Sequence, residues 1–250
     1  MKQYHNYIFD LYGTLADIRT DETGPLLWKR TALWFSEHGA AWTGRALKAA
    51  YRDFCAQEQA SSSVPYYEIE LRHVFGRLYR EKGIEASPEQ IEETASFFRI
   101  ASLKKLRLYS WVMPVFAGLR ARGGRLYLLS NAQACFTRPE LRFLGLEDAF
   151  DDTLLSSEAG VRKPSEDIMR QLLERNGLAV SESILIGNDR GSDIALAEAV
   201  GMDSFYLETE TSNRLLSEPA ATFEVLDGDG RRMIEILTGE QDLKKQRIGV

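Results

Sequence analysis

Side chains suited to catalysis occur at four places in this chain, and three of these places follow short apolar runs. The first is Asp10, which comes directly after Tyr7–Phe9 and is followed by a Gly-Thr turn ending at Thr14. A buried strand that ends in a carboxylate places it at the edge of a sheet where α/β proteins bind their ligands. The sequence therefore predicts that Asp10 takes part in chemistry rather than capping a helix.

At the other three places, polar groups either follow an apolar strand or lie in a loop. They are Ser130 and Asn131 after Leu126–Leu129, Lys163 in a loop before a predicted helix, and Asp189 and Asp193 after Ile184–Ile186. Asp189 and Asp193 are four residues apart, one helical turn, so both can face the same point. Each group also has an ordinary structural explanation when it is taken alone. Ser130 and Asn131 could form a turn, Lys163 could be a surface lysine, and Asp193 could be a charge that stabilises the start of a helix.

Together these groups are suited to phosphoryl transfer. Asp10 and Asp189 supply hard oxygen ligands for Mg²⁺, which a backbone carbonyl, water and phosphate oxygens complete. The second carboxylate oxygen of Asp10 is then available to attack phosphorus and form an aspartyl-phosphate. Lys163 offsets the crowded negative charge and steadies the transferring group.

The remaining groups are predicted to bind phosphate or to orient their neighbours. We expect Ser130 and Asn131, together with Thr14 and Lys163, to contact phosphate oxygens. Asp193 is predicted to orient Lys163 or a metal-bound water from outside the ligand shell.

These motifs resemble those of the haloacid dehalogenase-like (HAD) hydrolase superfamily, in the C1-type branch with a helical cap inserted after the first motif. The matching residues, in order, are Asp10-Leu11-Tyr12-Gly13-Thr14-Leu15, Ser130-Asn131, Lys163-Pro164, and Gly187-Asn188-Asp189 with Asp193. The resemblance covers nearly the whole chain. It implies a Rossmann-like core with the strand of Asp10 at its centre, Mg²⁺ dependence and hydrolysis of small phosphate esters.

Tyr12 departs from the phosphatase pattern of that superfamily. Phosphatases carry a second Asp there as general acid and base, whereas members with Tyr are typically dehalogenases, which attack carbon without a metal. Dehalogenases also tend to carry a Tyr six residues after the motif lysine, where this chain has Met169. Asp189 and Asp193 instead resemble the phosphatase metal site, and a carboxylate cluster is costly unless a cation neutralises it.

We therefore predict a Mg²⁺-dependent phosphatase that is slow because Tyr12 replaces the usual acid and base. The backbone carbonyl of Tyr12 is predicted to bind the metal, and its phenol to be a weak proton donor, with Asp17 or a cap side chain as the alternative donor. Two alternatives stay open. One is a phosphate- or metal-binding protein with little turnover, and the other is a metal-independent 2-haloacid dehalogenase.

Strands that alternate with helix-length segments predict an α/β fold, here a Rossmann-like three-layer core with a parallel sheet. This core is predicted to comprise residues 1–16 and 109–250. Residues 17–108 have helical periodicity and no convincing strand, so we predict that they form an inserted helical cap domain. Within it, Ser87-Pro88 has the pattern of a helix N-cap followed by Pro at the first helical position.

Composition and charge indicate which partners and which compartment to expect. The 250 residues carry a net charge of −6, which gives no electrostatic reason to expect nucleic acid as a partner. There is no membrane-length apolar run and no signal-peptide pattern, and two cysteines without a CxxC spacing favour a reducing compartment. We expect a cytoplasmic enzyme whose partner is a small phosphorylated metabolite, with no prediction of its oligomeric state.

Overall fold

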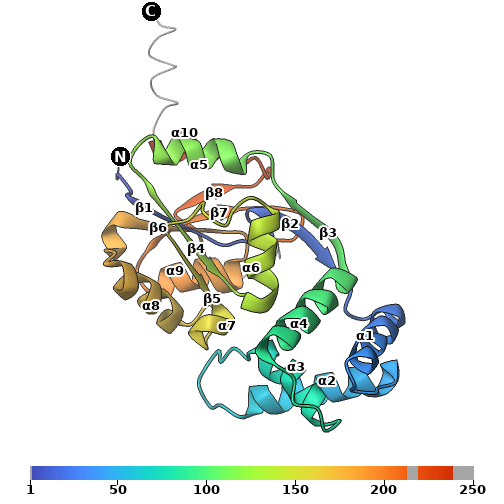
Figure 1. Ribbon diagram of the computed structural model, residues 1–250. Helices are drawn as coiled ribbons and strands as arrows, with labels where there is room; N and C mark the ends of the chain where they lie inside the picture. The colour runs from blue at the N-terminus through green and yellow to red at the C-terminus, as the bar shows by residue number, and fades with distance from the viewer. Residues whose placement is uncertain (1, 213–218, 239–250) are drawn as a thin grey trace, which may run out of the picture.

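A parallel β-sheet and a separate group of helices make up the molecule. The computed structural model describes residues 2–212 and 219–238. In Figure 1 the sheet and the helices beside it form one part, while α1 to α4 gather at the end of the molecule away from both termini.

The sheet has six strands, all parallel, in the order β5-β4-β1-β6-β7-β8. Its strands are β1 (Asn6–Phe9), β4 (Arg125–Ser130), β5 (Asp152–Leu155), β6 (Ser183–Gly187), β7 (Asp203–Leu207) and β8 (Phe223–Val225). Strand β1 lies between β4 and β6, and its register pairs Phe9 with Leu128 and Ile186. The carboxyl ends of β1, β4 and β6 therefore meet at one edge, as the fold-class prediction requires.

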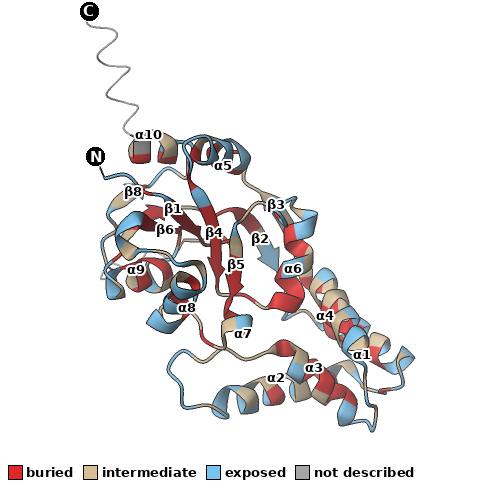
Figure 2. Ribbon diagram, turned by 60° about the vertical axis from the view of Figure 1, so that its left-hand side comes forward, coloured by how far each residue is buried: buried red, intermediate tan, exposed pale blue. Residues whose placement is uncertain are grey.

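Helices cover both faces of the sheet, which gives three layers. One face is covered by α5 (Val112–Arg120), α6 (Ala134–Phe143) and α10 (Arg232–Thr238), with Phe9 and Leu128 among the strand residues in that core. Ile8 and Leu129 point to the opposite face, where α8 (Glu166–Asn176) and α9 (Ala195–Ala199) pack. Figure 2 shows the central strands buried along almost their full length. The predicted three-layer α/β fold is confirmed.

The helices of the second part have their own hydrophobic core. They are α1 (Pro25–Glu37), α2 (Gly44–Ala60), α3 (Leu71–Arg80) and α4 (Pro88–Ser102). Phe98 is fully buried and packs against the rings of Trp28, Tyr51 and Phe75. Phe136, at the start of α6, joins this cluster from the sheet-containing part. We call residues 25–102 the helical unit.

Two strands connect the helical unit to the rest of the chain, and the expectation that residues 17–108 contain no strand is wrong. Strands β2 (Ala16–Thr20) and β3 (Leu103–Leu108) pair antiparallel. Their sequences interleave charged residues with apolar ones, so neither forms the continuous apolar run by which the buried strands were recognised. Across the pair, Arg107 donates a 2.8 Å hydrogen bond to Asp17.

Local capping signals explain several helix boundaries. Ser87 accepts a hydrogen bond from Gln90 N and so caps α4, as predicted, and Ser165 likewise caps α8. Gly177 ends α8 in the left-handed conformation. The segment after β6 begins with a five-residue π-helical turn, η2 (Arg190–Ile194), which precedes α9.

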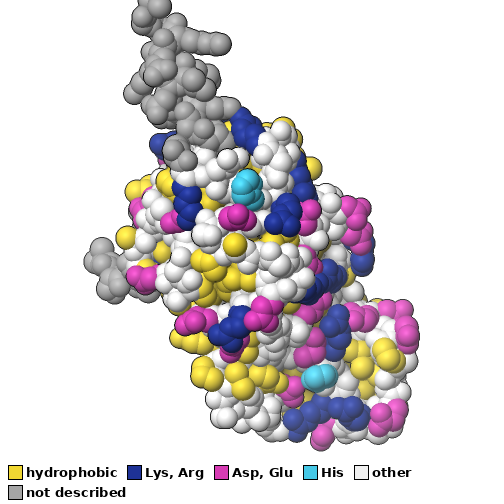
Figure 3. Space-filling view, turned by 90° about the vertical axis from the view of Figure 1, so that its left-hand side faces the viewer, with side chains coloured by type: hydrophobic (Ala, Val, Ile, Leu, Met, Phe, Trp, Pro, Cys, Tyr) yellow, Lys and Arg dark blue, Asp and Glu magenta, His cyan; other side chains and the backbone are white. Residues whose placement is uncertain are grey.

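The short elements complete the described chain. They are α7 (Ser156–Ala159) and the 3₁₀ turn η1 (Val180–Glu182). On the face seen in Figure 3, Lys and Arg are interspersed with Asp and Glu. Within residues 2–212 and 219–238, no helix combines the length and the apolar character needed to span a membrane.

The buried aromatic cluster should determine the stability of the helical unit. Phe98→Ala removes a fully buried ring and should lower the free energy of unfolding by about 3–5 kcal/mol. Urea unfolding followed by tryptophan fluorescence measures this change, because Trp28, Trp34 and Trp42 all lie in the helical unit. Leu33→Ala, at an exposed site on α1, is the control and should change stability by less than about 0.5 kcal/mol. Equal losses in both variants would contradict the assignment of this core.

Candidate active site

A cavity of about 300 Å³ opens at the carboxyl edge of the sheet, where β1, β4 and β6 end. Asp10 follows β1, and its backbone N–H donates to Ile186 O, which extends the ladder to β6 by one residue. The described residues that line the cavity include every predicted site residue except Thr14: Asp10, Tyr12, Ser130, Asn131, Lys163, Asp189 and Asp193. The structure thus brings together groups that are up to 183 positions apart in the sequence.

Lys163 joins two carboxylates at the base of this cavity. Its Nζ donates to Asp10 Oδ1 at 2.7 Å, to Asp193 Oδ1 at 2.6 Å and to Leu129 O at 2.9 Å. The ammonium group therefore uses all three of its protons. Its side chain is 1% exposed, so the charge is stable there only because both carboxylates neutralise it. Asp193 therefore contacts Lys163, and its role in orienting that residue stays a prediction.

Backbone geometry after β6 brings Asp193 to this position. In the turn η2, Asp193 N donates to Asp189 O, and Asp193 Oδ2 accepts from Asp189 N. A Cβ on Gly187 would lie 2.2 Å from the Asp193 carboxylate, so glycine is required where the turn passes the strand end. Burial raises the pKa of Asp193 above its usual range, although Lys163 opposes this rise.

The hydroxyl groups of the site point at Asp10. Ser130 Oγ donates to Asp10 Oδ1 at 3.0 Å. Thr14 Oγ1 lies 3.1 Å from Asp10 Oδ2 and equally far from Asn188 Oδ1. These contacts fix the orientation of the carboxylate and keep Oδ2 on the side away from Lys163 and Ser130.

Asn131 is engaged differently from the expectation that it contacts phosphate. Its Oδ1 accepts from Lys163 N at 2.7 Å, and its Nδ2 donates to Lys163 O at 3.1 Å. The amide thereby holds the lysine-bearing loop against the end of β4. Asn131 acts here as a positioning residue for Lys163.

Asn188, which belongs to the fourth motif but had no predicted role, is buried within the site. Its Oδ1 faces Thr14, and its Nδ2 donates to Thr209 and Thr211. Asp189, the next residue, is exposed at the rim of the cavity, and its Oδ1 accepts from Gly191 N. Two adjacent polar residues after a strand end point to opposite sides, and composition alone does not indicate which of them faces inward.

The oxygen donors of the cavity fit a Mg²⁺ ion that is completed by water and substrate. Asp10, Asp189 and Asp193 line the cavity, and Lys163 is the one cation among the described lining residues. A divalent cation would offset the remaining negative charge. No three carboxylate, histidine or cysteine side chains cluster as ready-made ligands within the described residues. Mg²⁺ commonly binds through one or two protein carboxylates and retains several waters.

The phenol of Tyr12 is turned away from Asp10. Its hydroxyl donates to Glu140 in a short hydrogen bond and lies 2.9 Å from Thr137 Oγ1. Arg99 of α4 forms an ion pair with Glu140 at 2.6 Å and lies over the Tyr12 ring at 5.7 Å. Burial, and then the charge of Glu140, raise the pKa of Tyr12 well above its usual value. Near neutral pH the phenol therefore keeps its proton and shares it with Glu140.

Asp17 and Met169, which were both considered in the sequence, lie outside the residues that line the cavity. Burial opposes ionisation of Asp17, but hydrogen bonds from Lys105 and Arg107 lower its pKa. It is thus a salt-bridged carboxylate on β2 and not a proton donor. Met169 is fully buried in the core between α8 and the sheet.

A model of the family described as "haloacid dehalogenase-like hydrolase" matches residues 4–201. A phosphoserine phosphatase of Thermus thermophilus is 31% identical over 135 residues, and the match spans about half of each chain (53% of both). A glyceraldehyde 3-phosphate phosphatase of Methanopyrus kandleri is 26% identical over 70% of this chain and 73% of its own length.

A solved structure has the same fold over almost the whole chain. The 2-haloacid dehalogenase of Pseudomonas syringae pv. tomato is 18% identical, with a TM-score of 0.66 over 95% of this chain and 100% of that protein. At this identity the likeness concerns the fold alone.

Removal of the Lys163 charge should destabilise the protein in a pH-dependent manner. Lys163→Met leaves Asp10 and Asp193 without their cation, which should lower the free energy of unfolding at pH 8 by about 3–5 kcal/mol. The pKa of Asp193, already raised by burial, would rise further. Its protonation as the pH falls relieves the repulsion, so the loss should be smaller at pH 5.

Urea unfolding of the native protein and the variant at both pH values measures this difference. Lys104→Met, an exposed lysine on β3, serves as the control and should have little effect at either pH. A loss for Lys163→Met that is the same at pH 5 and pH 8 would contradict the assigned charge cluster.

Proposed function

The chain belongs to the haloacid dehalogenase-like hydrolase family, and from this premise we propose that it is a Mg²⁺-dependent phosphatase of small phosphate monoesters. The observation that carries the proposal is the Asp10–Lys163–Asp193 cluster at the carboxyl edge of the sheet. It holds Asp10 Oδ1 with the ammonium group of Lys163, while Asp10 Oδ2 lies beside the hydroxyl group of Thr14.

The proposed reaction has two steps. In the first, a carboxylate oxygen of Asp10 attacks phosphorus, the bond from phosphorus to the ester oxygen breaks, and the alcohol departs after gaining a proton. In the second, water attacks the aspartyl-phosphate, which releases inorganic phosphate and regenerates Asp10. Lys163, whose ammonium touches Asp10 Oδ1, stabilises the negative charge near the transferring group, and Ser130 orients the nucleophile.

Mg²⁺ fits this proposal as the cofactor. When bound, it would neutralise and polarise the phosphate oxygens. Asp10, the backbone carbonyl of Tyr12 and Asp189 are the proposed protein ligands, and all three residues line the cavity. The exposed position of Asp189 suits a metal ligand at the rim of the cavity.

Residues 17–108, the helical insertion, are proposed to form a cap domain. Its separate hydrophobic core and its contribution of Glu22, Glu68 and Arg99 to a cavity beside Asp10 support this role. Free thiols at Cys55 and Cys135 support the proposed reducing, cytoplasmic location. The proposed partner is a small phosphorylated metabolite.

Tyr12 is proposed to make alkyl phosphates slow substrates. A positioned general acid typically contributes about 10²–10⁴ in rate, and the phenol is hydrogen-bonded to Glu140 instead of facing the ester oxygen. We propose that Tyr12 serves the site through its backbone carbonyl, while its side chain joins the Asp10 loop to α4 and α6.

A metal-dependence assay with the Asp10→Asn variant tests the nucleophile. Phosphate release from p-nitrophenyl phosphate should require Mg²⁺ and stop with EDTA, and Asp10→Asn should retain less than about a tenth of the rate, since an amide is a poor nucleophile. Asp53→Asn, exposed on α2, is the control and should keep full activity. Metal-independent halide release from a 2-haloacid would favour a dehalogenase instead, and tight phosphate-ester binding without turnover would favour a binding protein.

Restoring a carboxylate at position 12 tests the account of Tyr12. Tyr12→Asp should raise hydrolysis of an alkyl phosphate at least about tenfold over the native chain. Tyr12→Asn is the control, because an Asn side chain has the size of Asp but no acidic proton. The rate of alkyl phosphate hydrolysis should not rise in this variant. Brisk native turnover of alkyl phosphates, or a folded Tyr12→Asp protein without any gain, would overturn this account.

A further inference from the structure

A second cavity of about 310 Å³ adjoins the one that contains Asp10. Tyr12 and Asn131 line both. The helical unit and the linker before it contribute Glu22, Glu68, Leu71 and Arg99, and the start of α6 contributes Gln133, Phe136 and Thr137. Because the cavities share a wall, this space is next to the position that a phosphate group would take at Asp10. We call it the leaving-group cavity.

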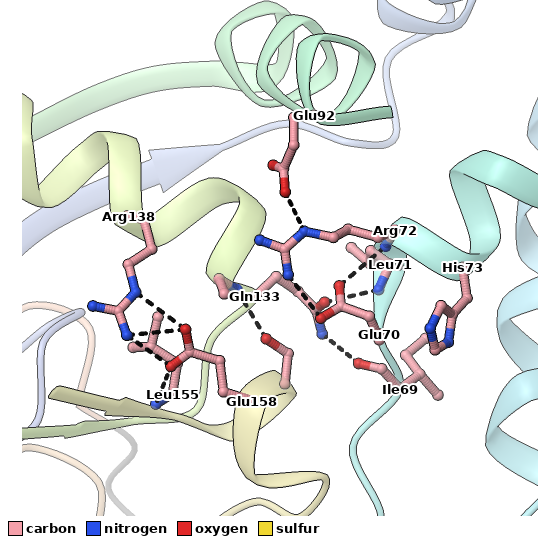
Figure 4. A network of polar contacts seen from close by, with 12 residues as sticks. Ile69, Glu70, Leu71, Arg72, His73, Glu92, Gln133, Arg138, Leu155 and Glu158 are labelled. Atoms are coloured by element: carbon pink, nitrogen blue, oxygen red, sulfur yellow. Dashed lines mark hydrogen bonds and ion pairs between the residues drawn. The ribbon is translucent and has the colours of Figure 1, made fainter. Parts of the chain in front are cut away.

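The polar groups of the leaving-group cavity are largely hydrogen-bonded to one another. Gln133 Oε1 accepts from Leu71 N at 2.9 Å, and its Nε2 donates to Ile69 O at 2.8 Å and to Glu68 at 3.2 Å. Figure 4 shows Gln133 reaching from α6 to the chain that leads into α3. Ser156 donates to the other Glu68 oxygen. These groups offer few unused partners to a polyhydroxylated ligand.

Other polar side chains in the cavity are engaged as well. Arg99 binds Glu140, Thr137 contacts Tyr12, and Asn131 holds the main chain of Lys163. The guanidinium charge of Arg99 is therefore already matched by a carboxylate. It does not provide an uncompensated positive charge for an anionic group.

Glu22 differs from the other polar residues of this cavity. It lies in the linker between β2 and α1, and none of the described residues forms a hydrogen bond or an ion pair with its carboxylate, although Arg99 lies near enough to influence it. Burial raises the pKa of Glu22, and the charge of Arg99 lowers it. Glu22 is an exposed residue, so its carboxylate is open to an incoming cation. A carboxylate that no neighbouring side chain pairs can accept a charge-assisted hydrogen bond from such a cation.

We propose that the substrates are phosphate monoesters whose alcohol carries an ammonium group, and that Glu22 binds this group. The inference rests on the phosphatase activity proposed above. Glu68 adds a second negative charge to the same cavity, and Leu71 and Phe136 provide an apolar wall for the carbon chain between phosphate and nitrogen. Alcohols that carry a carboxylate would be repelled by both glutamates, so the cavity selects against them as well.

Two phosphonates of the same size test the proposal without turnover. 2-Aminoethylphosphonate ends in an ammonium, and n-propylphosphonate ends in a methyl group. With Mg²⁺ present, calorimetry on the native protein should give a Kd at least about tenfold lower for the amino compound, because a charge-assisted hydrogen bond is gained. Glu22→Gln keeps the shape of the side chain and should bring the two dissociation constants within about threefold.

Glu37→Gln is the matched control, since Glu37 is exposed on α1 away from this cavity. It should preserve the preference of the native protein. Equal affinity of native protein for the two phosphonates would overturn the ammonium proposal and leave the phosphatase proposal intact. A preference that survives in a folded Glu22→Gln protein would exclude Glu22 as the recognition residue. Failure of both phosphonates to bind would instead contradict the phosphate site itself.

Discussion

One buried ammonium group shared between two carboxylates organises this molecule. Lys163 is almost completely withdrawn from water, and its charge is stable only while Asp10 and Asp193 remain in contact. Each of the three residues comes from a different loop at the carboxyl edge of the sheet, so the contact fixes the relative positions of those loops. The order of the strands, with β1 between β4 and β6, is what makes the contact possible.

The neighbouring polar groups are arranged to keep this contact in place. The side chain of Asn131 forms two hydrogen bonds with the main chain of Lys163, and Gly187 leaves room for the Asp193 carboxylate. A second cluster, of Tyr12, Glu140 and Arg99, joins the loop after β1 to α6 and to the helical unit. The nucleophile loop is thus tied to both the sheet and the helical unit.

The sequence was sufficient to predict the parts whose signals are local. Buried strands such as Ile184–Ile186 are continuous apolar runs, and polar residues that follow such runs led to the prediction of Asp10 and Asp193. Lys163 was predicted from its position in a loop before a helix. Strands β2 and β3 were missed because their alternating charges face solvent and each other, and β8 because it has three residues. Charge partners were also beyond prediction. Glu140 and Arg99 are 41 positions apart, and nothing in their sequence surroundings indicates that they meet at Tyr12.

The central claim is that Asp10 carries the phosphoryl group during turnover. The most direct measurement is to quench the native protein with acid during hydrolysis of an aryl phosphate, reduce it with borohydride, and identify the modified residue by mass spectrometry. An aspartyl-phosphate at Asp10 predicts homoserine at position 10, dependent on Mg²⁺ and on substrate. If the native protein releases phosphate during this hydrolysis but no homoserine is found at position 10, the account is contradicted.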